Sequence, residues 1–189
     1  MASKAEGSVL SRIPWRLIGW GAAVALLLLP LIAMQFSKDV VWTLGDFIAF
    51  GVMLLMVGVP LELAARLSSN WSYRGGAALA LLGMFLTIWA NLAVGIVGSE
   101  NSPANQLFFV ALLVGLAGAA MARFRAAGMA KAMVATAAAL GLAFVIASSG
   151  ATDEPMVKHS VEAIGTSIFA ALFLASAALF RKASRARPR

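Results

Sequence analysis

Six long apolar runs place the strongest limit on what this chain can fold into. The hydrocarbon core of a bilayer is about 30 Å thick, and a helix needs roughly 20 apolar residues to cross it. Runs of about that length cover residues 15–36, 42–63, 75–97, 103–122, 128–147 and 161–180. We therefore predict an all-α, polytopic membrane protein, a helical bundle with six transmembrane helices.

The composition supports a membrane protein over a soluble one. Hydrophobic residues make up 61% of the chain and charged residues 12%, whereas soluble domains contain about 25% charged residues. A soluble core of this size cannot bury so much apolar surface, so the lipid bilayer is the expected partner. Other membrane proteins or a second copy of the chain are further candidates. The net charge of +7 does not predict nucleic-acid binding, because the basic residues lie between apolar runs and at the termini.

The connections between the runs are too short to form a soluble domain. We expect a single six-helix transmembrane domain over residues 15–180, with a cytoplasmic tail at 1–14 and a basic cytoplasmic tail at 181–189. The first run follows basic residues, as a signal peptide does, but it is longer than a usual signal core and no A-x-A cleavage pattern follows it. We interpret it as a retained helix.

The basic residues also predict the orientation. If the runs alternate in direction, all but Lys38 and Lys158 of the 15 lysines and arginines fall on one side. The opposite side carries those two lysines with nearby acidic residues, namely Asp39, Glu100, Asp153 and Glu154. The positive-inside rule then places both termini in the cytoplasm. The alanine- and arginine-rich, cysteine-free composition is typical of a bacterial chain, which predicts the bacterial inner membrane.

Small residues at a spacing of four predict where helices touch, because lipid-embedded helices associate by close packing. Such ridges occur in the last three runs. Their members are Ala111, Gly115 and Ala119, then Ala135, Ala139, Ala143 and Ala147, and finally Ala163, Ser167, Ala171 and Ala175.

Four polar residues within or beside the apolar runs form the candidate polar or ion site: Asp46, Asn91, Asn105 and Glu162. Ionisable groups within a membrane are costly and therefore suggest function. Asp46 and Glu162 each lie about one turn from the predicted outer surface. Either could attract a cation or exchange a proton, or could simply be stabilised by the positive end of its helix. Asn91 is predicted either to join helices by a hydrogen bond or, with Asn105, to contribute a neutral ligand.

The remaining polar residues favour a non-enzymatic protein. Glu62 precedes Arg66 by four residues, which predicts a structural ion pair on one helix face. His159 is the single histidine and there are no cysteines, so the common histidine- and thiolate-based metal sites lack their ligands. No nucleophile has a partner base at a known spacing. We therefore expect no catalytic residues, no metal and no cofactor.

Two segments, WTLGDF at 42–47 and NLAVGIVGSENSPAN at 91–105, carry a family resemblance. They resemble an uncharacterised family of small multipass bacterial inner-membrane proteins. The resemblance covers mainly the second to fifth runs. It implies a multipass inner-membrane protein and brings no activity or ligand to these residues.

The favoured function is that of a structural, accessory or interaction component of the inner membrane. The alternative is a small proton or cation transporter or channel with an outward-facing polar vestibule at the candidate site. An intramembrane enzyme is the third interpretation.

Overall fold

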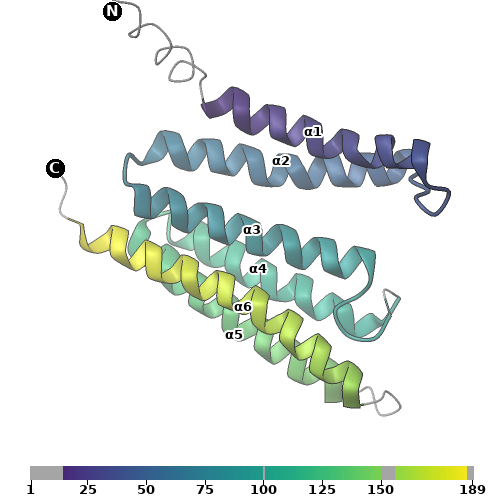
Figure 1. Cartoon of the computed structure of the whole chain (residues 1–189). Coiled ribbons are helices and arrows are strands. Elements are labelled where there is room, and N and C mark those ends of the chain that lie inside the picture. The colour runs from purple at the N-terminus through teal and green to yellow at the C-terminus, as the bar shows by residue number, and fades with distance from the viewer. Residues whose placement is uncertain (1–14, 100, 150–155, 187–189) are drawn as a thin grey trace, which may run out of the picture. The chain divides into compact units, whose positions relative to one another are not determined.

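A computed structural model describes residues 15–99, 101–149 and 156–186, with six long α-helices and one short 3-10 helix in these ranges (Figure 1). The helices are α1 (Trp15–Phe36), α2 (Leu44–Leu67), α3 (Trp71–Ala93), η3 (Pro103–Asn105), α4 (Gln106–Met121), α5 (Ala126–Ser149) and α6 (Met156–Arg185). Six of them are long and apolar enough to span a membrane. The predicted all-α, six-helix architecture is confirmed, and the chain is a multi-pass membrane protein.

Polar residues move several helix ends away from the ends of the apolar runs. The Asn70 side chain accepts hydrogen bonds from the backbone N–H groups of Ser72 (2.8 Å) and Tyr73 (3.4 Å). This cap starts α3 at Trp71, four residues before the predicted start. At the other end of the chain, α6 continues through basic residues to Arg185. Its 30 residues correspond to about 45 Å at 1.5 Å per residue, which exceeds the apolar thickness of a bilayer.

The chain divides into two compact units, Met1–Leu63 and Ala64–Arg189, and we describe each unit separately. The single transmembrane domain over residues 15–180 stays a prediction. In the first unit, α1 meets α2 through Trp20. A Cβ atom at Gly58 would lie 3.1 Å from the Trp20 ring, so glycine gives the indole room. Leu27 of α1 approaches Gly51 in a similar way, at 4.0 Å.

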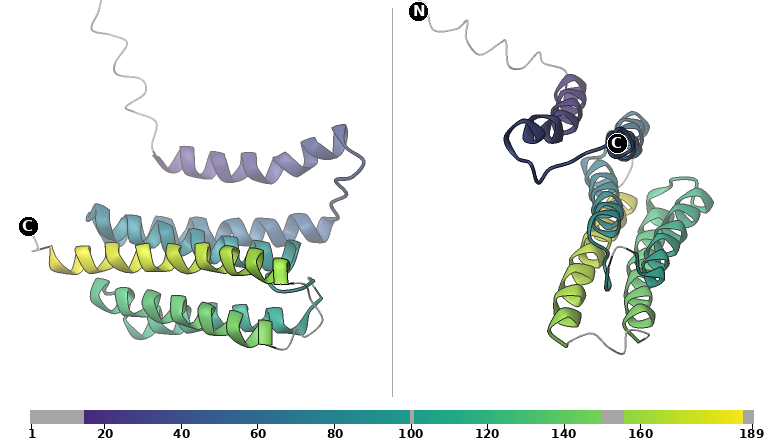
Figure 2. Two further views of the ribbon diagram at one scale, coloured as in Figure 1. Left: turned by 60° about the horizontal axis from the view of Figure 1, so that its bottom comes forward. Right: turned by 90° about the vertical axis from the view of Figure 1, so that its right-hand side faces the viewer.

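The second unit contains α3, α4, α5 and α6. α6 lies between α3 and α5, and α5 lies between α6 and α4 (Figure 2). Residue pairing shows that α3 and α6 are antiparallel. Gly76 near the start of α3 faces Phe180 near the end of α6, and Gly83 faces Phe173. At both glycines a Cβ atom would lie 3.1 Å from the phenylalanine ring.

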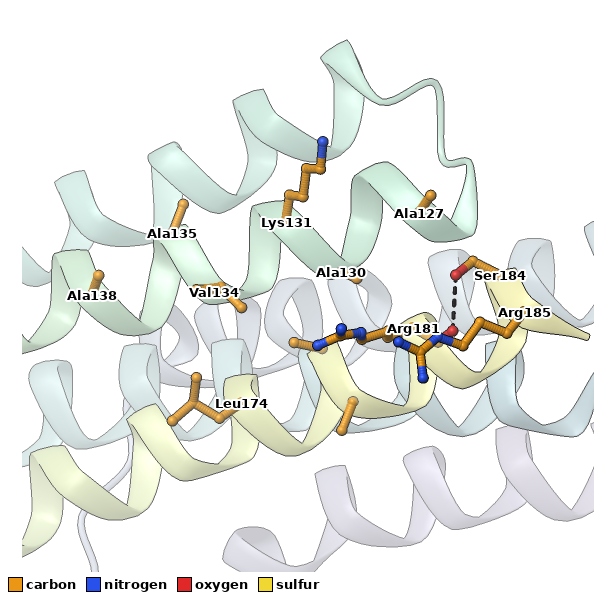
Figure 3. A pocket seen from close by; sticks show the side chains of 12 residues that line it. Ala127, Ala130, Lys131, Val134, Ala135, Ala138, Leu174, Arg181, Ser184 and Arg185 are labelled. Carbon is orange, nitrogen blue, oxygen red and sulfur yellow. Dashed lines mark hydrogen bonds between the residues drawn. The ribbon is translucent and has the colours of Figure 1, made fainter.

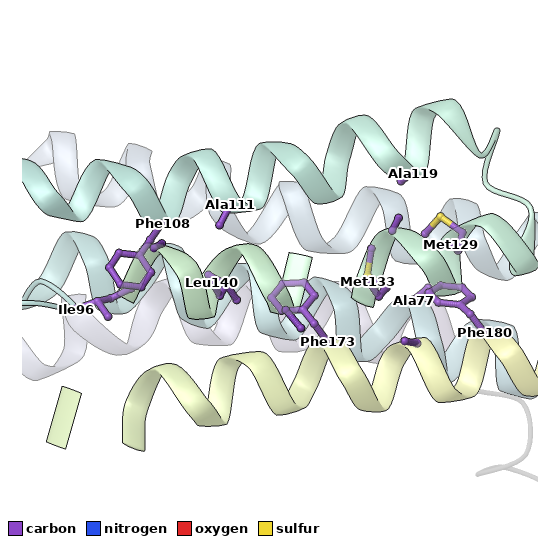
Figure 4. Close-up of a cluster of buried hydrophobic side chains, with 14 of the residues drawn as sticks. Ala77, Ile96, Phe108, Ala111, Ala119, Met129, Met133, Leu140, Phe173 and Phe180 are labelled. Carbon is purple, nitrogen blue, oxygen red and sulfur yellow. The ribbon is translucent and has the colours of Figure 1, made fainter. Parts of the chain in front are cut away.

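The core of the second unit combines aromatic rings with small residues (Figure 4). Phe108, Leu140 and Phe180 are completely buried. The buried hydroxyl of Ser176 donates a 2.7 Å hydrogen bond to the Gly76 carbonyl, which joins α6 to α3. α4 and α5 approach closely as well, because a Cβ atom at Gly118 would lie only 2.8 Å from that of Ala132. Close backbone approach of this kind is typical of helix association in membranes.

The predicted ridge of small residues is correct in α4, partly correct in α5 and wrong in α6. Ala111, Gly115 and Ala119 of α4 are all buried. In α5 only Ala143 and Ala147 of the predicted ridge are buried, and Ala135 is exposed. In α6 the residues Ser167, Ala171 and Ala175 are exposed, and the buried face is instead Thr166, Phe173, Ser176, Ala177 and Phe180. The reason is that α3 supplies the small residues at the α3–α6 contact, so α6 supplies large ones.

The contact between α4 and α5 predicts the effect of filling a glycine. Gly115 is buried against Thr136, whose hydroxyl would overlap a Cβ atom at position 115. Gly115→Leu should therefore lower the free energy of unfolding by about 1–3 kcal/mol, the usual range for overpacking. Thermal unfolding in detergent micelles measures this change. Gly141→Leu is the matched control, because nothing lies within 4 Å of a Cβ atom there. Equal destabilisation by both substitutions would contradict the packing described.

Candidate functional site

The candidate site is built around the loop that joins α3 to α4. After Ala93 the chain turns twice through left-handed glycines, Gly95 with φ of 76° and Gly98 with φ of 73°. A Cβ atom at Gly95 would lie 2.6 Å from the Ser99 carbonyl group. Glycine is therefore required there both by backbone conformation and by space.

Asn105 holds this loop in place. Its side chain is 3% exposed. Its Oδ1 atom accepts hydrogen bonds from the backbone N–H groups of Ile96 (3.1 Å) and Val97 (3.0 Å). Its Nδ2 atom donates to the Ser99 carbonyl at 2.8 Å. One buried amide therefore satisfies three backbone groups that the turns leave outside any helix.

Asn91 connects the end of α3 to the same residue. It is 3% exposed, and its Nδ2 atom donates a 2.9 Å hydrogen bond to the backbone carbonyl of Asn105. The bond links α3 to η3, as expected for an amide that joins helical elements. Asn91 and Asn105 therefore act on one loop from its two sides.

Glu162 brings α6 to the same loop. The backbone N–H group of Gly98 donates a 2.8 Å hydrogen bond to Glu162 Oε1. Thr166, one turn further along α6, is 4% exposed, and its hydroxyl has no hydrogen-bond partner among the described residues. Sequence reasoning missed Thr166, because a single hydroxyl within an apolar run has no distinguishing signal. Three predicted residues, Asn91, Asn105 and Glu162, thus meet at the α3–α4 loop.

Asp46 belongs to the first unit and has a local role at the start of α2. Its carboxylate accepts hydrogen bonds from the Thr43 backbone N–H (2.7 Å) and the Thr43 hydroxyl (2.8 Å). The Asp46 N–H in turn approaches the Thr43 hydroxyl at 3.4 Å. This reciprocal pattern is that of a helix N-terminal capping box. These contacts agree with the second interpretation of Asp46, in which the start of its helix stabilises the carboxylate.

Glu62 has partners on α1 that the sequence analysis did not identify. Arg16 Nε lies 3.5 Å from Glu62 Oε1, and Trp20 Nε1 donates to Glu62 Oε2 at 3.1 Å. Arg16 and Trp20 lie one turn apart on α1, so Glu62 joins α2 to one face of α1. The pairing of Glu62 with Arg66 stays a prediction. Only the observed pairing of α1 with α2 connects Arg16 and Trp20 to Glu62, because nothing in the sequence indicates which helices are neighbours.

Several of the polar residues named in the sequence analysis lie outside the part of the chain that the structure describes. Glu100, Asp153 and Glu154, together with the side chains of Lys158 and His159, lie outside the described residues. Within the described ranges, no three histidine, cysteine, aspartate or glutamate side chains gather as a metal site would require. The site as described contains two amides, one carboxylate and the backbone of one loop. Its hydrogen bonds hold that loop between α3, η3 and α6.

The role of Asn105 predicts a specific local defect when the amide is removed. Asn105→Leu leaves the N–H groups of Ile96 and Val97 without their acceptor in a buried place. Each of the two orphaned donors costs about 1–3 kcal/mol, so we expect the free energy of unfolding to fall by roughly 2–6 kcal/mol. Hydrogen exchange should show lost protection at these two amides. The neighbouring exposed amide in Gln106→Leu is the control. Unchanged protection in Asn105→Leu would disprove the assigned contacts.

Comparison with protein-family models, with curated proteins and with solved structures finds no match for this chain. The family resemblance of the 42–47 and 91–105 segments therefore stays a prediction.

Proposed function

We propose that this chain is a non-catalytic structural or accessory protein of the bacterial inner membrane, with both termini in the cytoplasm. The observation that carries the proposal is the use of the buried amides. A transport site needs groups that exchange between a ligand and water, whereas Asn91 and Asn105 bind the backbone of their own chain. Asn91 and Asn105 thereby have a structural role.

The two hydrogen bonds that Asn105 Oδ1 accepts also make this oxygen a poor ligand for a cation. An amide oxygen has two lone pairs, and those of Asn105 Oδ1 receive two backbone N–H groups. Coordination of a cation by this oxygen would therefore break at least one buried hydrogen bond. The loss costs about as much as leaving a buried donor unsatisfied, roughly 1–3 kcal/mol. Asn105 is better suited to fixing the loop than to binding an ion.

The first unit supports an interaction role. None of the residues in the apolar window of α1 is buried within the protein. Leu17, Ile18 and Val24, for example, are more than half exposed. Such surface is covered by lipid tails or by the helices of another membrane protein. An apolar helix that is not buried within its own unit fits an accessory component that contacts other membrane proteins.

A small proton or cation transporter remains the second candidate. The observation that favours it is the meeting of Glu162 with two asparagines at one end of the second unit. A carboxylate at that place could exchange a proton with the outer solution. In this alternative Glu162 would be the exchanging group, and Asp46 would only cap α2.

Flux through reconstituted protein separates the two functions. In liposomes with an imposed proton or potassium gradient, we expect the parent protein to show the rate of protein-free liposomes. Glu162→Gln and Asp46→Asn should show the same rate. Flux from the parent that falls in Glu162→Gln and persists in Asp46→Asn would establish the transporter instead. Asp46→Asn is the matched control, since it also neutralises one carboxylate at a predicted outer helix end.

The proposed orientation has its own test. A fluorescent reporter that folds only in the cytoplasm should be bright when fused after Arg189 and dark when fused after Ser149. A phosphatase that is active only outside the cytoplasm should give the opposite pair of results. The reason is the distribution of basic residues, since all but two of the 15 fall on the predicted inner side. A dark reporter after Arg189 would reverse the orientation or change the number of spans.

A further inference from the structure

A groove runs between α5 and α6 at the end of the second unit where α6 ends (Figure 3). Its volume is about 820 Å³. Most of its wall is apolar and made of small side chains, among them Ala130, Ala138 and Ala178, with Val134 and Leu174. The polar part of the lining is Lys131, Arg181, Ser184 and Arg185. The Ser184 hydroxyl donates to the Arg181 carbonyl at 2.8 Å, so it belongs to its own helix.

The three cations of the groove have no acidic partner among the described residues that line it. No carboxylate lines the groove, and Glu162 is the one acidic side chain described in the second unit, bound to the Gly98 loop at its opposite end. Arg181 and Arg185 are four residues apart on α6 and therefore share a face. Figure 3 shows both guanidinium groups along the space between α6 and α5, whereas the Lys131 side chain on α5 points away from them. The groove thus has a positive end that attracts an anion.

The depth of these residues matches the layers of a bilayer. Lys131 lies five residues after the start of α5 at Ala126, which is about 8 Å along the helix axis. Arg181 and Arg185 follow the apolar stretch of α6, in its last two turns. The cations therefore reach headgroup level. Val134, Ala138 and Leu174 continue the groove toward the hydrocarbon.

We propose that this groove binds one anionic phospholipid from the leaflet on the C-terminal side. Its phosphate lies at Arg181 and Arg185, Lys131 adds positive charge from α5, and an acyl chain lies along the alanine-rich wall. Basic pockets between transmembrane helices are suited to anionic headgroups, and each nearby lysine or arginine adds about 1 kcal/mol of attraction. A second copy of the chain is a poorer occupant, because symmetric pairing would bring the same three cations together. A soluble anion would leave the apolar wall unused.

Lipid binding by the purified full chain tests the proposal. Native mass spectrometry in detergent compares phosphatidylglycerol with phosphatidylcholine of the same acyl chains. The parent should retain one phosphatidylglycerol under conditions that release phosphatidylcholine. Arg181→Gln with Arg185→Gln should weaken phosphatidylglycerol binding about 30-fold, as expected for two lost charges. Arg125→Gln with Lys182→Gln is the matched control: it removes two exposed cations of the same unit that do not line the groove, and affinity should stay within about twofold.

A second variant tests the apolar wall without changing charge. Ala138→Phe fills the groove and should weaken binding, whereas Leu142→Phe lies on α5 outside the lining and should not. Each variant must elute as the parent does.

Equal retention of the two lipids, or equal loss in both double variants, would overturn the proposal. So would binding of glycerol 3-phosphate as tight as that of phosphatidylglycerol, or a groove-dependent dimer without lipid selectivity. Liposome flux does not bear on this site, so the outcome is independent of the proposed function.

Discussion

Close packing at small residues is the constraint on which the second unit depends. In a bilayer, lipid tails are as apolar as leucine, so helices gain little from leaving lipid and must gain from contact with one another. Gly76 and Gly83 let the rings of Phe180 and Phe173 reach the α3 backbone. Gly118 lets α4 reach Ala132 in the same way. The α3–α6 contact brings α6 beside α3, and Glu162 of α6 binds the α3–α4 loop at Gly98.

The hydrogen bonds of Asn91, Asn105 and Glu162 follow from that packing and from the burial of the loop backbone within the protein. Two left-handed glycines turn the chain sharply after α3 and leave N–H and carbonyl groups outside any helix. Buried groups of this kind need partners within the protein. Asn105 supplies an acceptor for two N–H groups and a donor for one carbonyl. The amides of the candidate site are thus explained by the turn they stabilise.

Parts of the fold and of the candidate site could be predicted from the sequence, and the reasons differ from residue to residue. Apolar length is a local property, so all six helices could be predicted, and an amide in an apolar run such as Asn91 predicts a hydrogen bond between elements. The contact face of α6 is not local: alanines occur on several sides of that helix, and the phenylalanines of the true face are matched by glycines about a hundred residues earlier. The role of Asn105 needs the geometry of the Gly95 turn, which spacing alone does not give.

The two ends of the second unit use polar residues in opposite ways. At the α3–α4 loop, each described hydrogen bond of Asn105 goes to the protein's own backbone, so this amide stabilises the loop. At the other end, Lys131, Arg181 and Arg185 are exposed beside an apolar groove with no carboxylate in its lining. Cations without a counter-charge among the described lining residues attract an anion from outside, and the anions at headgroup depth are phospholipids. Recognition by the second unit is therefore expected at its basic end, although the buried polar residues are the more conspicuous feature of the sequence.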